Sequence, residues 1–167
     1  EEQVDINRKD ALERLLAIAN DAKGKRPVNW DTVEELITLS RPRKPANLHG
    51  THVAGIIGAE QVGTNHPGMC PDIGLYDFRV LGKSLEDTEF AIIAALQYIR
   101  YINERHNYMS IHGANLSLSI PHDVRNYGCG RTPVCLECER LVDSGRLVRL
   151  DSAAITARAA IWRDRIA

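Results

Sequence analysis

Residues 1–46 alternate short apolar clusters with polar stretches, in the period of amphipathic helices. Residues 10–20 carry apolar side chains three and four positions apart, which predicts a helix. Asp31, with Glu34 three positions later, has the pattern of a capping box, so a second helix is predicted to begin at Asp31. A basic turn at residues 23–27 separates the two helices, and the proline-containing residues 41–45 predict a solvated linker.

After this segment the pattern changes to strands alternating with helices. Two segments have strand composition, at residues 73–81 and 114–120. Two others have the helical period: residues 86–106, with Phe90 predicted on the apolar face, and a segment that begins at Val134. A strand, a long helix and a second strand within about 45 residues form a crossover unit with parallel strands. The sequence therefore predicts an α/β fold, with ligands at the carboxyl ends of its strands.

The bulk composition argues against several classes of partner. The 167 residues carry a formal net charge of −1, with a pI near 6.7, so charge does not favour nucleic acid or an anionic membrane. Aromatic residues make up 5% of the chain, which is few for stacking on unpaired bases. No apolar run reaches the roughly 18 residues that span a bilayer. We predict no nucleic acid and no membrane partner, and nothing in the sequence points to an oligomeric state.

Residues 49–58 form the most unusual segment, because they have the composition of a buried helix that contains three glycines. Each interior glycine costs a helix about 1 kcal/mol relative to alanine, so we expect another backbone to approach these positions closely. His49 begins the segment, and a tightly packed helix would hold its ring in one orientation, as a catalytic base requires. His52 follows three residues later, but no His-Glu-x-x-His metal motif is present. The glycines are Gly50, Gly55 and Gly58.

The run His-Gly-Thr-His-Val-Ala-Gly at residues 49–55 resembles the histidine motif of the subtilisin-like serine peptidases, the subtilases. The resemblance implies that His49 is the general base and that His52 only packs or forms hydrogen bonds. It also implies a partial subtilisin-like parallel sheet flanked by helices. Without the resemblance, a histidine near glycines would more often be a structural residue.

Three further segments match the family in order and spacing. They are Gly-Met-Cys-Pro at residues 68–71, Arg-Val-Leu at residues 79–81 and Ala-Asn-Leu-Ser-Leu-Ser at residues 114–119. The resemblance implies that Ser117, Leu118 and Ser119 form an edge that binds an extended polypeptide substrate by strand addition. Ser119 departs from the glycine that is usual there. The alternative is an ordinary sheet strand, with Leu116 and Leu118 in the core.

The resemblance covers residues 47–145 and implies a partial subtilase catalytic domain there. It is preceded by the polar helical segment 1–46, interpreted as an insertion and linker. Three family elements are missing from this sequence: the Gly-Thr-Ser-Met-Ala run that holds the serine, the apolar strand ending in Asp-Thr-Gly, and the Ala-Ala-Gly-Asn strand end that supplies the oxyanion donor. The aspartate is expected upstream of Glu1 in a longer product. We predict that this chain alone has no appreciable peptidase activity; the alternative is a non-catalytic peptide-binding remnant.

The tail at residues 146–167 diverges from the family pattern. A buried parallel strand is a nearly continuous apolar run, and Arg146 and Arg149 would each bury a charge there at a high cost in free energy. One hypothesis is that the tail is not native subtilase sequence and arises from a frameshift or a spurious gene end. The other is a diverged amphipathic tail helix that includes Ile155 and Trp162.

Four cysteines give a second candidate chemistry. Four thiolates would suffice for zinc, but only one Cys-x-x-Cys pair exists and it lies within the predicted helix from Val134. We interpret the thiols as structural and predict no metal and no cofactor, with a cysteine-held zinc module as the alternative. No carboxylate cluster marks a calcium loop. The cysteines are Cys70, Cys129, Cys135 and Cys138.

Overall fold

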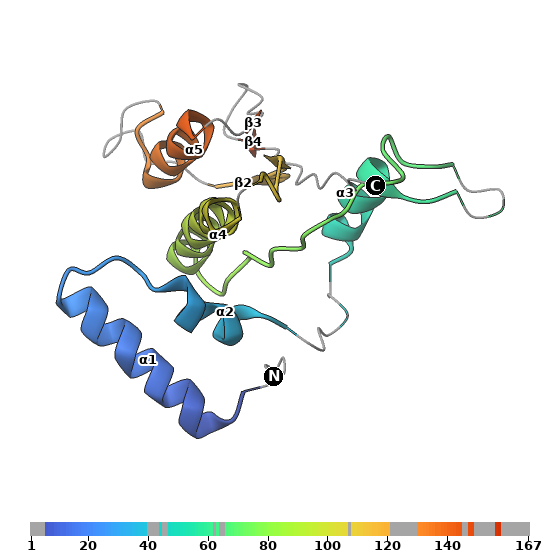
Figure 1. Cartoon of the computed structure of the whole chain (residues 1–167). Coiled ribbons are helices and arrows are strands. Elements are labelled where there is room, and N and C mark those ends of the chain that lie inside the picture. Colours follow the sequence, from blue (N-terminus) through green and yellow to red (C-terminus); the bar gives the residue numbers. More distant parts are fainter. Residues whose placement is uncertain are drawn as a thin grey trace. The chain divides into compact units, whose positions relative to one another are not determined.

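The computed structural model divides the chain into two compact units, Glu1–Asn47 and Leu48–Ala167 (Figure 1). Within the described part of the chain there are five helices and four two-residue strands. The described residues are 6–39, 44, 47–61, 63, 66–106, 108–120 and 130–144, together with the strands at 147–148 and 156–157.

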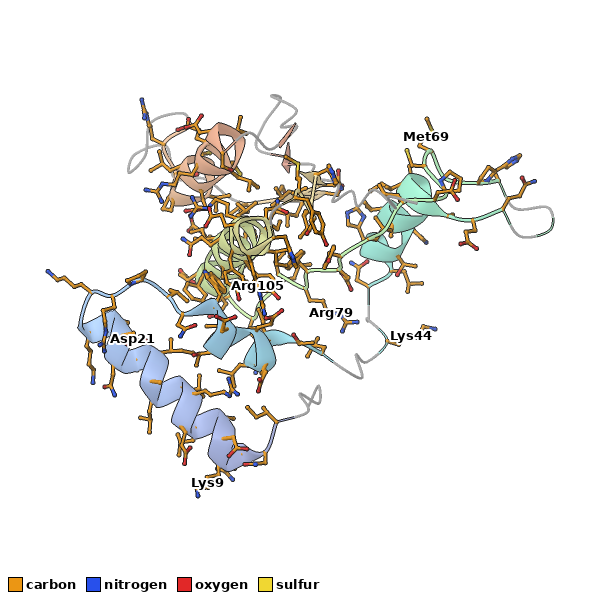
Figure 2. All side chains as sticks on the ribbon, in the orientation of Figure 1. Lys9, Asp21, Lys44, Met69, Arg79 and Arg105 are labelled. Atoms are coloured by element: carbon orange, nitrogen blue, oxygen red, sulfur yellow. The ribbon has the colours of Figure 1, made fainter. Side chains whose placement is uncertain are left out.

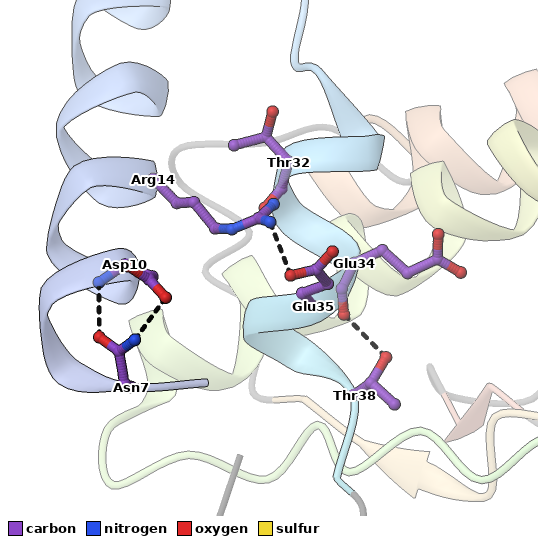
Figure 3. Close-up of polar contacts among 7 residues, drawn as sticks. All are labelled: Asn7, Asp10, Arg14, Thr32, Glu34, Glu35 and Thr38. Carbon is purple, nitrogen blue, oxygen red and sulfur yellow. Dashed lines mark hydrogen bonds and ion pairs between the residues drawn. The ribbon is translucent and has the colours of Figure 1, made fainter. Parts of the chain in front are cut away.

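The first unit is a pair of helices, α1 (Arg8–Lys23) and α2 (Trp30–Ile37). Asn7 caps α1, because its side-chain oxygen accepts hydrogen bonds from two backbone N–H groups of the first turn. Arg14 of α1 forms an ion pair with Glu35 of α2 at 2.6 Å (Figure 3). No residue of either helix is buried, so polar contacts at the surface, rather than an apolar core, join the two helices.

The sequence predicted both helices of this unit but placed the second cap wrongly. Helix α2 begins at Trp30, and its cap is Asn29, whose Oδ1 accepts from the Asp31 N–H at 3.1 Å. Asp31 therefore lies in the first turn, where its carboxylate interacts favourably with the positive end of the helix dipole and stabilises the helix. Asn29 competes with Asp31 because asparagine is an equally good cap. Of the predicted linker at residues 41–45, only Lys44 lies within the described residues.

The core of the second unit lies between α4 (Leu85–Arg105) and α5 (Pro133–Asp143), which pack against each other (Figure 1). Ser84 caps α4 in a reciprocal capping box with Asp87. Thr132 caps α5, followed by Pro133 in the first turn, where proline fits a helix. The buried apolar side chains of the two helices are Ile92, Leu96, Tyr98, Ile99, Ile102, Val134, Cys138 and Leu141.

The prediction of a helix at residues 86–106 is confirmed, but its predicted apolar face is partly wrong. Phe90 is 72% exposed, whereas Ile92 is 1% exposed. Two residues on a helix differ by about 200° around its axis, so these side chains point in nearly opposite directions. Both faces carry apolar residues at helical spacing, and packing against α5 selects the face with Ile92. The predicted helix from Val134 is also confirmed and is α5.

The strands are short and form two separate pairs. Strand β1 (Gly113–Ala114) pairs in parallel with β3 (Leu147–Val148), so that α5 lies on the crossover between two parallel strands. Strand β2 (Leu118–Ser119) pairs antiparallel with β4 (Thr156–Ala157). The described residues are thus mostly helical, and they contain no sheet of more than two strands.

The predicted strand at residues 73–81 is not formed; only an isolated bridge at Gly74 occurs there. The predicted strand at residues 114–120 becomes the end of β1 and the separate β2. Strand composition describes a segment that fits a sheet, but a strand forms only where a partner supplies the ladder of hydrogen bonds. The parallel sheet expected around these segments is therefore not seen as such, apart from the β1–β3 pair.

One carboxylate is buried at the contact between α4 and α5. Glu137 is 1% exposed, and its Oε2 accepts from Gln97 Nε2 at 3.3 Å and from Arg140 Nη1 at 3.0 Å. Its Oε1 lies 3.0 Å from Nη2 of Arg100, at a charge-pair distance but outside hydrogen-bond geometry. Arg100 is thus the cation that offsets the charge on this oxygen.

We expect Arg100→Met to lower the free energy of unfolding by about 2 kcal/mol, because it leaves a buried carboxylate oxygen without its charge partner. Arg140→Met is the matched control: the Arg140 side chain is 62% exposed, and its removal should cost less than about 1 kcal/mol. Urea unfolding followed by circular dichroism measures both values. Equal costs for the two variants would contradict the role given to Arg100.

Candidate active site

The predicted histidine segment forms α3 (His49–Gly58), a ten-residue helix. The prediction that this helix is buried is wrong: none of its residues is buried, and Ile56 is 69% exposed. Small and apolar residues make a helix suitable for burial, but burial also needs a surface that covers it. His49 and His52 are both exposed.

The close approach of a second backbone was expected at all three glycines of α3, but the one tight contact, at Gly58, is with a side chain; the nearest backbone atom there, Cys70 O, would lie 3.4 Å from an added Cβ. A Cβ added at Gly58 would lie 2.5 Å from Ile73 Cγ2, whereas at Gly50 and Gly55 no described atom lies within 4 Å. The closest approach of backbone is on the other side of this contact, at Gly68. A Cβ there would lie 2.5 Å from the backbone N of Ala59.

Residues 68–70 form hydrogen bonds with the last turn of α3. The N–H groups of Gly68, Met69 and Cys70 donate to carbonyls of Ala59, Ile56 and Ile57 at 2.8, 3.0 and 2.8 Å. These bonds satisfy carbonyls that a helix end leaves without partners. The Met69 side chain itself is 82% exposed and projects from this segment (Figure 2). The Gly-Met-Cys-Pro match pointed to this segment, but the sequence did not predict that Gly68 has no room for a Cβ because backbone atoms of α3 and its cap surround it.

His49 lies against the segment that was predicted to bind substrate. Its Nε2 is 2.8 Å from the backbone oxygen of Ser117, which is 68 residues further along the chain. A carbonyl oxygen only accepts hydrogen bonds, so Nε2 is the donor in this contact. In the neutral ring the proton-accepting lone pair is therefore on Nδ1. The structure thus brings together the predicted base and one of the predicted substrate-binding residues.

The segment that carries Ser117 is anchored on both sides. Ala114 and Leu116 are buried, while Leu118 is half-buried and Ser119 is exposed. Within the segment, Asn115 Nδ2 donates to the Ser117 hydroxyl at 2.7 Å. Leu118 and Ser119 pair through their backbones with β4, so the edge predicted to bind a peptide already carries a strand of this chain.

Asn103 holds the connection between α4 and β1. It is 5% exposed; its Oδ1 accepts from the N–H groups of Ser110 and Ile111 at 2.9 and 2.8 Å, and its Nδ2 donates to the Ile111 carbonyl at 2.8 Å. One amide therefore satisfies three backbone groups of the turn before β1. This function of Asn103 was not predicted from the sequence, where Asn103 is only one residue of the predicted helix 86–106. The available signal was a polar residue in line with the buried Ile92, Leu96 and Ile99.

The cysteines do not form a metal site within the described residues, where no three His, Cys, Asp or Glu side chains are grouped to hold an ion. Cys129 lies outside the described residues. Cys70, Cys135 and Cys138 are free thiols. Cys138 is 1% exposed, and burial, with the charges of Cys135, Glu137 and Glu139, raises its pKa to about 11.

We expect Cys138 to be alkylated about 100-fold more slowly than the half-buried Cys70, because only the thiolate reacts. A rise in pKa from 9.0 to about 11 lowers the thiolate fraction by that factor, and burial further limits access. Iodoacetamide labelling at pH 8, with mass spectrometry of the peptides that contain Cys70 and Cys138, measures the two rates. Equal rates would contradict the burial of Cys138.

The family model described as the Subtilase family matches residues 2–136 of the 167. This chain belongs to the subtilase family. Among curated proteins, Subtilisin DY of Bacillus licheniformis is 38% identical over 52 residues, which are 31% of this chain and 19% of that protein. The chain thus spans about a fifth of the length of this relative. No solved structure matches the chain.

The subtilases are a family of serine-type peptidases with an α/β fold. The family match begins at residue 2, so it includes α1 and α2 as well as the histidine segment. No helix among the described residues of this subtilase chain has the length and apolar character to cross a bilayer. Most of the divergent tail, at residues 146, 149–155 and 158–167, lies outside the described residues. The strand at Thr156–Ala157 does not fit the hypothesis of a tail helix that includes Ile155 and Trp162, and the hypothesis of a frameshift or a spurious gene end stays a prediction.

Proposed function

We propose that this chain is part of a subtilisin-like serine endopeptidase in which His49 is the general base and Ser117, Leu118 and Ser119 bind an extended peptide. The fold that goes with this function is a partial parallel sheet flanked by helices. The observation that supports the proposal most is the 2.8 Å contact between His49 Nε2 and the Ser117 carbonyl, since it joins two segments that the family motif assigns to one active site.

In this proposal His49 removes the proton from a serine hydroxyl and returns it to the leaving amine. In the subtilase-type triad the serine proton goes to Nε2, but in this structure Nε2 donates to Ser117. The ring therefore has to turn away from the carbonyl before Nε2 accepts a proton. In the structure the imidazole lies beside the peptide edge with a proton on Nε2, so Nε2 cannot act as a base until the contact with Ser117 is broken.

The peptide edge is the backbone of Ser117 to Ser119. An extended peptide adds to such an edge through main-chain hydrogen bonds, while pockets for alternate side chains give specificity. Because β4 pairs with Leu118 and Ser119, a peptide that uses the same side of the edge has to displace β4. The half-buried Leu118 and the exposed Ser119 would then face the peptide along β2.

The chain alone is proposed to lack appreciable peptidase activity, because its sequence has no Gly-Thr-Ser-Met-Ala run, no Asp-Thr-Gly strand end and no Ala-Ala-Gly-Asn strand end. Without nucleophile and oxyanion donor, little of the catalytic stabilisation is left. A fluorogenic peptide assay tests this: hydrolysis by the chain should equal that of His49→Ala and of His52→Ala. Hydrolysis that His49→Ala abolishes and His52→Ala retains would overturn the proposed inactivity and directly support His49 as the base.

A peptide-binding role without catalysis is the second candidate, since it needs only the β2 edge. Titration of a fluorescently labelled extended peptide, followed by anisotropy, tests it. We expect saturable binding that Ser119→Pro abolishes, because proline removes a main-chain donor from the edge. The absence of saturable binding to the unaltered chain would exclude this role.

A further inference from the structure

Two consecutive hydrogen bonds connect Asn115 to the imidazole of His49. Asn115 Nδ2 donates to the Ser117 hydroxyl at 2.7 Å, and the Ser117 carbonyl accepts from His49 Nε2 at 2.8 Å. Asn115 does not itself contact His49 through either bond. It is connected to the ring through the side chain and backbone of Ser117.

We propose that Asn115 is a positioning residue that fixes the orientation of the His49 ring by holding the backbone of Ser117. The inference deepens the proposed function and rests on it for the meaning of the ring's orientation. The link itself depends only on the two hydrogen bonds.

The segment needs such a device because no ladder fixes its backbone. Residues 115–117 lie between β1 and β2 and belong to neither strand. The direction of the Ser117 carbonyl is therefore set by local contacts. Leu116 is 9% exposed and anchors the middle of the segment in the core, while the Asn115 amide ties down the Ser117 side chain beyond it. Displacement of Ser117, with its carbonyl, away from His49 would have to break or strain the bond between the Asn115 amide and the Ser117 hydroxyl.

The free energy of the hydrogen bond between Asn115 and Ser117 is of the size expected to hold the orientation of one ring. A single hydrogen bond of this kind contributes only modestly to the stability of a fold, and the His49 end is exposed to solvent. The loss of the Asn115 bond should thus loosen the ring without unfolding the core between α4 and α5. A residue that only stabilised the fold would affect the free energy of unfolding but not the ring in the folded protein.

The test is NMR on the full chain with labelled histidine. In the unaltered protein we expect nuclear Overhauser cross-peaks between the His49 ring protons and protons of Ser117 and Leu118. We also expect a ring order parameter near the rigid-backbone value of about 0.85. The ring of His52, three residues along the same helix, is the internal reference for a histidine without this contact to Ser117.

Asn115→Ala should weaken those cross-peaks at least about threefold and lower the His49 order parameter below about 0.6, the range of flexible groups, with His52 unchanged. Ser117→Ala removes the same bond from its other end and should have the same effect. The double variant should show no further loss, since both changes break one link. Ser117→Thr keeps the hydroxyl and should retain the ordered ring.

Unchanged cross-peaks and ring order in Asn115→Ala would overturn the proposal, as would additive effects in the double variant. Should Asn115→Ala fail to fold, the comparison of Ser117→Ala with Ser117→Thr decides the same question. If the unaltered chain does not bind peptide, but the order of its His49 ring still depends on Asn115, the proposed function is refuted and the link from Asn115 to His49 stands. If the unaltered chain binds peptide, but the order of the His49 ring does not depend on Asn115, only the link is refuted.

Discussion

Gly68→Ala is expected to lower the free energy of unfolding of the second unit by about 3 kcal/mol, through overpacking of a backbone contact. The added Cβ would lie 2.5 Å from Ala59 N, 2.7 Å from Gly58 N and 2.8 Å from Gly55 O. All three are backbone atoms of α3 and its cap, so no side chain can turn aside to make room. Denaturant unfolding followed by circular dichroism measures the loss.

The matched control is Gly55→Ala, in the interior of α3. No described atom lies within 4 Å of a Cβ at Gly55, and alanine favours a helix over glycine, so this change should stabilise by about 0.5–1 kcal/mol. The two substitutions are chemically identical, but the surroundings of the two glycines differ. Their effects on the free energy of unfolding should therefore have opposite signs. A Gly68→Ala variant as stable as the unaltered chain would contradict the contact between residues 68–70 and α3.

Asn103→Ala is expected to cost about 3 kcal/mol or more, since it leaves two buried N–H groups and one carbonyl without their partner. The three groups belong to Ser110 and Ile111, directly before β1. The substitution should therefore also loosen β1 and the segment that follows it to Ser117. Denaturant unfolding gives the stability, and amide hydrogen exchange at Ile111 and Ala114 reports the local effect.

Glu104→Ala is the control for this prediction. Glu104 is the next residue of α4 but is exposed, and surface substitutions usually change stability by less than about 1 kcal/mol. We expect it to leave the exchange of Ile111 and Ala114 unchanged. Similar losses in Asn103→Ala and Glu104→Ala would show that the amide does not hold the turn.

The helices could be predicted from the sequence because their signals are local. The spacing of apolar residues and the caps define α1, α4 and α5 within a few residues. The exposed face of α4 could not be predicted, since Phe90 and Ile92 both have suitable spacing and only contact with α5 distinguishes them. The strands depend on partners distant in sequence, so composition at residues 73–81 predicted a strand where no described residue supplies a ladder.

The candidate site, too, could be predicted from the sequence only in part. The histidine motif and the Ala-Asn-Leu-Ser-Leu-Ser segment pointed to His49 and Ser117, and the structure places their atoms 2.8 Å apart. The motif carried no information on which ring nitrogen faces the carbonyl, or on the bond from Asn115. Nor did glycine content show which glycine is sterically required: the contact at Gly68 depends on where residues 68–70 meet the end of α3.

The central claim, that His49 and the β2 edge form one peptide-binding active site, is tested most directly by titrating the ¹⁵N-labelled chain with an extended peptide. We expect the backbone signals of Ser117, Leu118 and Ser119 and the ring signals of His49 to shift together, with a single dissociation constant. Saturable shifts confined to other parts of the chain, or none at all up to millimolar peptide, would contradict it.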